Sequence, residues 1–153
     1  MKHKPVLTRD DVARILEHAR AEALANQWAV TIAVVDDGGH PLALERLDGA
    51  APVSAYIATE KARTSALGRR ASADYEEMIK AGRNAFLSAP LTAMLEGGVP
   101  IVVEGQVVGA VGVSGVKSNQ DAQVASVGIA SLSSTSPSNL GERPSFPDGG
   151  AKR

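Results

Sequence analysis

Two apolar segments, each folded about a short glycine turn, constrain the fold of this 153-residue chain more than any other feature. The first runs from Val30 to Leu47 about the turn Asp37-Gly38-Gly39, and the second runs from Val99 to Val113 about Glu104-Gly105-Gln106. Two strand-forming runs joined by a glycine turn are typical of a β-hairpin. The sequence therefore predicts two hairpins, whose polar ends are places where rigid strands could present functional groups.

Apolar residues at helical spacing predict helices before, between and after the two hairpins. The first helix is expected to begin at Thr8, a favourable N-cap, because Asp10 and Asp11 follow where carboxylates favour the positive end of the helix dipole. Pro90 interrupts an apolar stretch, so residues 84–96 are expected to form a short or broken helix and a loop. The expected helices are residues 8–26, 54–67, 72–82 and 119–130.

The order of these elements favours an α+β fold. Hairpins give antiparallel pairs, and the intervening helices return the chain so that both hairpins can join one sheet. We therefore expect a four- or five-stranded antiparallel sheet built from the two hairpins, with the helices mainly on one face. The length favours one domain, residues 1–132. Residues 133–153 are rich in Ser, Pro and Gly, and this tail is expected to be disordered in isolation.

Composition argues against several classes of protein. The formal net charge of −1 gives no positive field to gather nucleic acid or anionic lipid, so neither partner is expected. The chain has no cysteine, which excludes disulfides, thiolate metal sites and a cysteine nucleophile. No apolar run approaches the ~20 residues of a membrane span. Residues 1–11 lack the apolar core of a signal peptide, so we expect a cytoplasmic protein.

The low aromatic content bears on assembly. Aromatic residues make up 3% of the chain, so the core must be built from Val, Ile, Leu and Ala. Alanine-rich faces bury little area per residue, and such a domain can gain stability by burying more surface between subunits. The composition therefore predicts a homo-oligomer.

The chain has three histidines, and two of them are candidate ligands. His3 is expected in a mobile terminus with no specific role. His18 is expected at the flank or on the solvent side of the first helix, either as an ordinary surface histidine or as an axial ligand to haem iron. His40 is expected at a hairpin tip, where it either belongs to the turn or contacts a ligand. No His-x-x-x-His or His-Glu-x-x-His spacing occurs, which argues against a zinc site.

The glycine-rich run at residues 109–115 resembles a nucleotide loop only superficially. It lies in the returning strand of a hairpin rather than after a βαβ strand, and Val116 separates it from Lys117, so neither the dinucleotide nor the P-loop pattern is met. The glycines are better explained by close packing of a strand against a helix. Ser114 and Lys117 precede the last helix, whose N-terminal N–H groups could receive a carboxylate.

Four charged residues form a second candidate site. Arg46 and Asp48 follow a strand, Lys61 lies within a helix of small residues, and Asp121 opens the last helix. Each is consistent with a surface ion pair. If they converge beside Gly98, they would instead form a polar pocket for a small acid. In that case Asp48, Lys61 and Asp121 are the candidate catalytic groups, and Arg46 is a candidate for binding the ligand.

Several short motifs between residues 30 and 130 together resemble the GlcG/HbpS family of haem-binding proteins, which includes the C-terminal domain of PduO-type adenosyltransferases. The resemblance implies an α+β domain that assembles into dimers, tetramers or octamers, and haem binding in some members through a histidine of the first helix. His18 matches that histidine by position. The motifs are Val35-Asp36-Asp37-Gly38-Gly39-His40, Arg46-Leu47-Asp48-Gly49-Ala50, Ser54 with Ala58 and Lys61-Ala62, Gly97-Gly98-Val99-Pro100, the run 105–115, and Asp121 with Val124-Ala125.

Three functions remain open at this stage. The first is an oligomeric haem- or tetrapyrrole-binding protein, with His18 on the iron and Lys or Arg side chains on the propionates. The second is a small-molecule catabolic enzyme that binds a small carboxylate or aromatic substrate at an intersubunit pocket. The third is an accessory subunit without a ligand.

Overall fold

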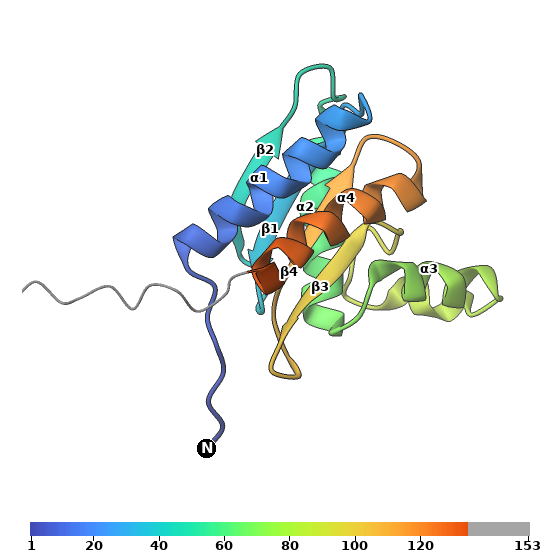
Figure 1. The fold of residues 1–153 in the computed structure, drawn as a ribbon. Helices are drawn as coiled ribbons and strands as arrows, with labels where there is room; N and C mark the ends of the chain where they lie inside the picture. The colour runs from blue at the N-terminus through green and yellow to red at the C-terminus, as the bar shows by residue number, and fades with distance from the viewer. Residues whose placement is uncertain (135–153) are drawn as a thin grey trace, which may run out of the picture.

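The computed structural model describes residues 1–134, which form a four-stranded sheet with helices packed against it (Figure 1). The predicted tail lies, from residue 135 onward, outside the described residues. The elements are α1 (Arg9–Ala25), β1 (Thr31–Asp36), β2 (Pro41–Arg46), α2 (Val53–Gly68), α3 (Ser72–Lys80), the 3-10 helix η1 (Asn84–Ser88), β3 (Gly98–Val103), β4 (Gln106–Ser114), α4 (Ser118–Ala130) and the 3-10 helix η2 (Ser131–Ser134).

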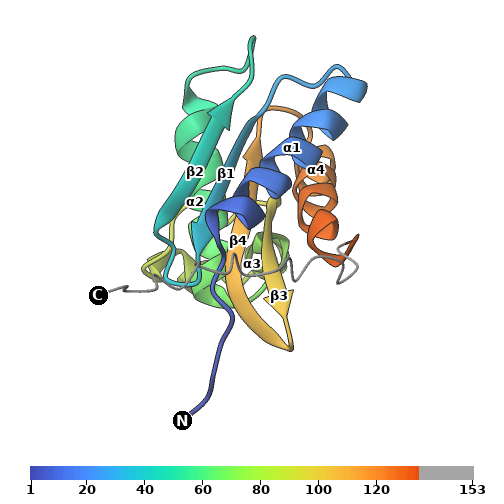
Figure 2. The same cartoon turned by 60° about the vertical axis from the view of Figure 1, so that its left-hand side comes forward.

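The sheet has the order β2-β1-β4-β3, and every neighbouring pair is antiparallel (Figure 2). The two hairpins meet where β1 pairs with β4, from Thr31 opposite Ser114 to Asp36 opposite Gly109. This arrangement confirms the predicted α+β class with four strands built from two hairpins. The expected start of α1 is also confirmed, because the Thr8 hydroxyl accepts the N–H of Asp11 at 3.2 Å and the Asp11 carboxylate accepts the N–H of Thr8 at 2.8 Å.

The helices cover both faces of the sheet, so the expectation that they lie mainly on one face was wrong. Figure 1 shows α1 and α4 in front of the strands and α2 behind them. Ile32 and Val34 of β1 belong to the core under α1 and α4, whereas the alternate residue Val35 packs with Ala62 and Ala66 of α2. A strand that is apolar on both faces requires cover on both sides.

Two glycines let α2 approach the sheet unusually closely. A Cβ atom added to Gly112 would overlap the carbonyl oxygen of Ala58 and lie 2.5 Å from the backbone nitrogen of Ala62. A Cβ on Gly98, which lies opposite Gly112 in β3, would overlap the carbonyl oxygen of Lys61. These contacts confirm the predicted strand–helix packing for Gly112, whereas a Cβ on Gly109 or Gly115 would meet the backbone oxygen of Val35 or Ala29 instead. Among the helices formed by residues 1–134, none combines the length and apolar character that a bilayer-spanning segment requires.

Candidate functional site

A row of polar residues crosses the end of the sheet where β2 and β4 finish. Thr31 lies opposite Arg46 on one side and opposite Ser114 on the other, so these three residues share the face that α2 covers. Neighbouring strands are about 4.8 Å apart, which places Arg46 and Ser114 roughly 10 Å from each other across the row. The Thr31 hydroxyl donates to the Ser54 hydroxyl at 2.7 Å, and the Ser54 hydroxyl donates to the carbonyl oxygen of Ala51.

Lys61 and Asp121 form an ion pair inside the protein, next to this row. The Lys61 ammonium lies 3.0 Å from a carboxylate oxygen of Asp121, and the two side chains are 5% and 3% exposed. The same ammonium donates to the carbonyl oxygen of Val113 at 3.0 Å. The other carboxylate oxygen of Asp121 accepts the N–H of Val116 at 3.1 Å. The pair therefore connects α2, the end of β4 and the first turn of α4.

The surroundings of the pair determine its ionisation. Burial raises the pKa of the Asp121 carboxyl, although the hydrogen bond and the charge of Lys61 act in the opposite direction. Gly97, with a φ of 130°, closes the site, since a Cβ there would lie 2.8 Å from the Lys61 nitrogen. Each charge faces the other rather than solvent. This geometry is typical of an ion pair that holds α2, β4 and α4 together, rather than of a group that exchanges protons with a substrate.

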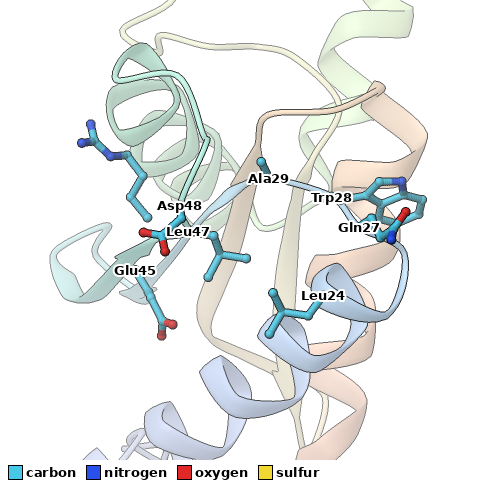
Figure 3. A pocket seen from close by; sticks show the side chains of 8 residues that line it. Leu24, Gln27, Trp28, Ala29, Glu45, Leu47 and Asp48 are labelled. Atoms are coloured by element: carbon cyan, nitrogen blue, oxygen red, sulfur yellow. The ribbon is translucent and has the colours of Figure 1, made fainter.

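Arg46 and Asp48 lie at a different place, beside an open cavity of about 510 Å³ at the end of α1. Figure 3 shows Leu24 and Leu47 pointing toward each other across this hollow. Glu45 extends from the α1 face of β2 and receives a hydrogen bond from Arg20 at 2.8 Å. The cavity is lined by Leu24, Gln27, Trp28, Ala29, Glu45, Arg46, Leu47 and Asp48.

The four charged candidates are thus divided within the described part of the chain. Lys61 and Asp121 are paired in the interior and are absent from the lining of the 510 Å³ cavity, as far as residues 1–134 go. Arg46 follows Glu45 in β2, so its side chain leaves the strand on the face opposite to the cavity floor formed by Glu45 and Leu47. Within one chain the four residues therefore lie at two separate places, with Lys61 and Asp121 in the interior and Arg46 and Asp48 near the 510 Å³ cavity.

The first-helix histidine is exposed and held in a defined orientation. The Nδ1 atom of His18 lies 2.9 Å from the carbonyl oxygen of Arg14, one turn earlier in α1. A carbonyl oxygen can only accept a hydrogen bond, so Nδ1 carries the proton and Nε2 keeps its lone pair when the ring is neutral. Among the described residues, the nearby 410 Å³ cavity on α1 is lined by Val12, Ala13 and Leu16 rather than by His18.

His40 lies at the tip of the β1–β2 hairpin, at the other end of the sheet from Arg46. Its Nδ1 atom is 3.0 Å from a carboxylate oxygen of Asp36, which also accepts the backbone N–H groups of Gly38 and His40. These bonds account for both residues as parts of the turn. Residues 1–134 contain no group of three or more His, Asp or Glu side chains placed to hold a metal ion.

The remaining predicted residues lie around the β4–α4 connection. Gly98 begins β3 against α2, Ser114 ends β4, and Lys117 precedes α4, where its N–H donates to the side chain of Gln120 at 3.3 Å. Sequence reasoning named Ser54 only as part of a family motif and missed Thr31, so it missed the buried hydroxyl pair of the polar row. Thr31 could have been found from the alternation of side chains along β1, which places it on the same face of the sheet as Ala33.

Comparisons with known proteins agree with this architecture. The family model described as "Haem degrading protein HbpS-like" matches residues 7–130. Protein GlcG of Escherichia coli (strain K12) is 57% identical over 114 residues, which cover 74% of this chain and 85% of that protein. The crystal structure of HbpS superimposes with a TM-score of 0.78 at 29% identity, covering 86% of this chain and 94% of that chain. A PduOC:heme complex has a TM-score of 0.75 at 24% identity, covering 83% and 95%.

Proposed function

Because this chain belongs to the HbpS-like family, we propose that it is an oligomeric protein that binds haem or a related tetrapyrrole, with Nε2 of His18 as an axial ligand. Support for the ligand class comes from the family description and from the haem complex of a protein with the same fold. When bound, haem supplies a redox-active iron whose axial position accepts an imidazole nitrogen.

The observation that carries this proposal is the hydrogen bond between His18 and the carbonyl oxygen of Arg14. Histidines that bind metals usually donate their second ring N–H to a carbonyl or carboxylate, because this bond fixes the tautomer and makes the free nitrogen a better ligand. His18 meets this requirement before any ligand arrives. The helix that carries it is anchored through Ile15 and Ala19, which are fully buried.

The exposure of His18 determines what kind of site is proposed. The ring stands on the solvent side of α1, so a flat ligand would lie across the surface of the helix rather than in a deep cavity. A surface ligand of this size gains further burial when a second copy covers it. We therefore propose that the protein works as a homo-oligomer, which also agrees with the several large apolar side chains that remain exposed.

Replacement of the proposed ligand gives the test. Titration of haemin into the purified wild-type protein is expected to shift the Soret band, and His18→Ala is expected to weaken binding at least about tenfold and to remove that shift. His40→Ala is the matched control, because His40 is also exposed and hydrogen bonded but lies at the tip of the β1–β2 hairpin rather than on α1. Equal spectra for wild type and His18→Ala, or no Soret shift in the wild type, would refute the proposal.

A further inference from the structure

The outward face of α2 carries a stripe of large side chains that stay largely exposed in the single chain. Val53, Tyr56 and Leu67 are 57%, 76% and 46% exposed, and Glu60 and Arg63 lie between them. These five residues, which we name the α2 seam, follow one another at spacings of three and four. That spacing places them on one side of the helix, in the pattern of positions at which helices pair with each other.

The arrangement of α2 is the reverse of an ordinary surface helix. Its inward face consists of small residues such as Ser54, Ala58 and Ala62, which fit against the glycines of the sheet. Its large apolar side chains are on the solvent side instead. A helix with apolar residues on both sides is expected to be buried on both sides. Figure 2 shows that α2 lies on the side of the sheet away from α1 and α4. On its outer face the Thr92 hydroxyl donates to the Glu60 carboxylate, while Val53, Tyr56 and Leu67 stay exposed in a single chain.

The exposed apolar surface continues onto the neighbouring edge strand. Leu44 lies opposite Ala33 in β1, so it points to the same face of the sheet as α2, and it is 48% exposed. The open surface therefore includes one helix and one strand, which is more than isolated exposed residues would give.

The order of side chains along the α2 seam is complementary to the same seam of a second copy. If the helix of a second copy runs antiparallel, Glu60 faces Arg63 of the partner subunit and Tyr56 faces Leu67 of the partner subunit. The two-fold axis repeats each contact, so the centre of the interface holds two opposite-charge pairs flanked by apolar contacts. We propose that the α2 seam is an interface between two copies of this chain, packed antiparallel about a two-fold axis. A parallel pair would instead place Glu60 against the same residue of the other helix.

This inference rests on the self-association that belongs to the proposed function, and it is independent of haem as the ligand. The Glu60–Arg63 pair is useful for a test because, within one chain, it contributes little to stability. The Arg63 side chain is 46% exposed, and its pair with Glu60 spans three residues of the same helix at 3.0 Å. Such exposed pairs add little to the stability of one chain, whereas like charges facing each other across an interface oppose association.

Charge reversal tests the antiparallel pairing directly. Arg63→Glu places two acidic residues on each seam, and Glu60→Arg places two basic residues there, so each variant alone is expected to associate at least about tenfold more weakly than the wild type. An equimolar mixture of the two variants is expected to regain the wild-type mass in sedimentation velocity, because each acidic seam then meets a basic one. Wild-type mass for each variant alone, or no recovery on mixing, would overturn the proposed pairing.

An apolar substitution checks the same surface without the ion pairs. Leu67→Lys is expected to reduce the assembled mass to half or less, while the circular dichroism spectrum and thermal midpoint stay near those of the wild type. Leu24→Lys is the matched control, because Leu24 is also an exposed leucine on a helix but belongs to α1 on the opposite face of the sheet. It should leave the assembled mass unchanged.

The outcomes separate the two proposals. If the wild type is a monomer at all concentrations, both the seam and the oligomeric part of the proposed function are wrong. If the wild type assembles but Leu67→Lys assembles equally well, the seam is not the interface, and haem binding at His18 is unaffected. If Leu67→Lys leaves the assembled mass unchanged but removes the binding of a different protein, the seam binds that protein and not a second copy. The proposal then fails.

Discussion

Gly112→Ala is expected to lower the free energy of unfolding by about 3 kcal/mol, at the upper end of the usual cost of overpacking. The added methyl group would overlap the carbonyl oxygen of Ala58 and lie 2.9 Å from the Cβ atom of Ala62. The backbone at Gly112 has no positive φ, so the cost comes from this contact and not from backbone strain. The substitution forces α2 away from the middle of the sheet, where its small side chains have their closest contacts.

Urea unfolding followed by circular dichroism measures this effect. For a chain of this length, 3 kcal/mol corresponds to a loss of about 6–12 °C in the thermal midpoint. Gly38→Ala is the control, because its new methyl group meets no backbone atom but the exposed ring of His40 at a hairpin tip and, at 3.5 Å, the carboxylate of Asp36. Similar losses for the two variants would show that α2 does not contact the sheet as closely as described.

A second substitution in α2 distinguishes a side-chain clash from a backbone clash. Ala58→Gly removes the methyl group of Ala58 but leaves the carbonyl oxygen that the new Cβ would overlap. The double variant Gly112→Ala, Ala58→Gly is therefore expected to be no more stable than Gly112→Ala alone. A recovery of stability would mean that the side chain of Ala58, rather than the backbone of α2, limits the approach of the helix.

The local elements of this fold could be predicted because their signals are local. Glycine turns and short apolar runs mark both hairpins, and the capping residues Thr8 and Asp11 mark the start of α1. The division of the helices between the two faces was not predicted. Its signal is the alternation of large Val111 and Val113 with small Ala110 and Gly112 in β4, which gives one face for large side chains and one for close helix packing.

The candidate site shows a different limit. Lys61 and Asp121 are 60 residues apart in sequence, and each has the local context of an ordinary surface charge. They meet only because the sheet order places β4 beneath α2 and directs the following chain into α4. Local sequence patterns contain no record of that order. The sequence patterns therefore identified the four charged candidates. They could not predict that only Lys61 and Asp121 would meet in the interior of a single chain.

Asp121→Asn is expected to lower the free energy of unfolding by about 3–5 kcal/mol near neutral pH, because it leaves the buried Lys61 ammonium without its counter-charge. Asp48→Asn, the same substitution at an exposed aspartate, is the control and should change stability by less than about 0.5 kcal/mol. Replacing both partners by apolar residues, as in Lys61→Met with Asp121→Leu, should recover most of the loss, because no unpaired charge remains. Equal losses for the single and double variants would contradict a charge-based cause.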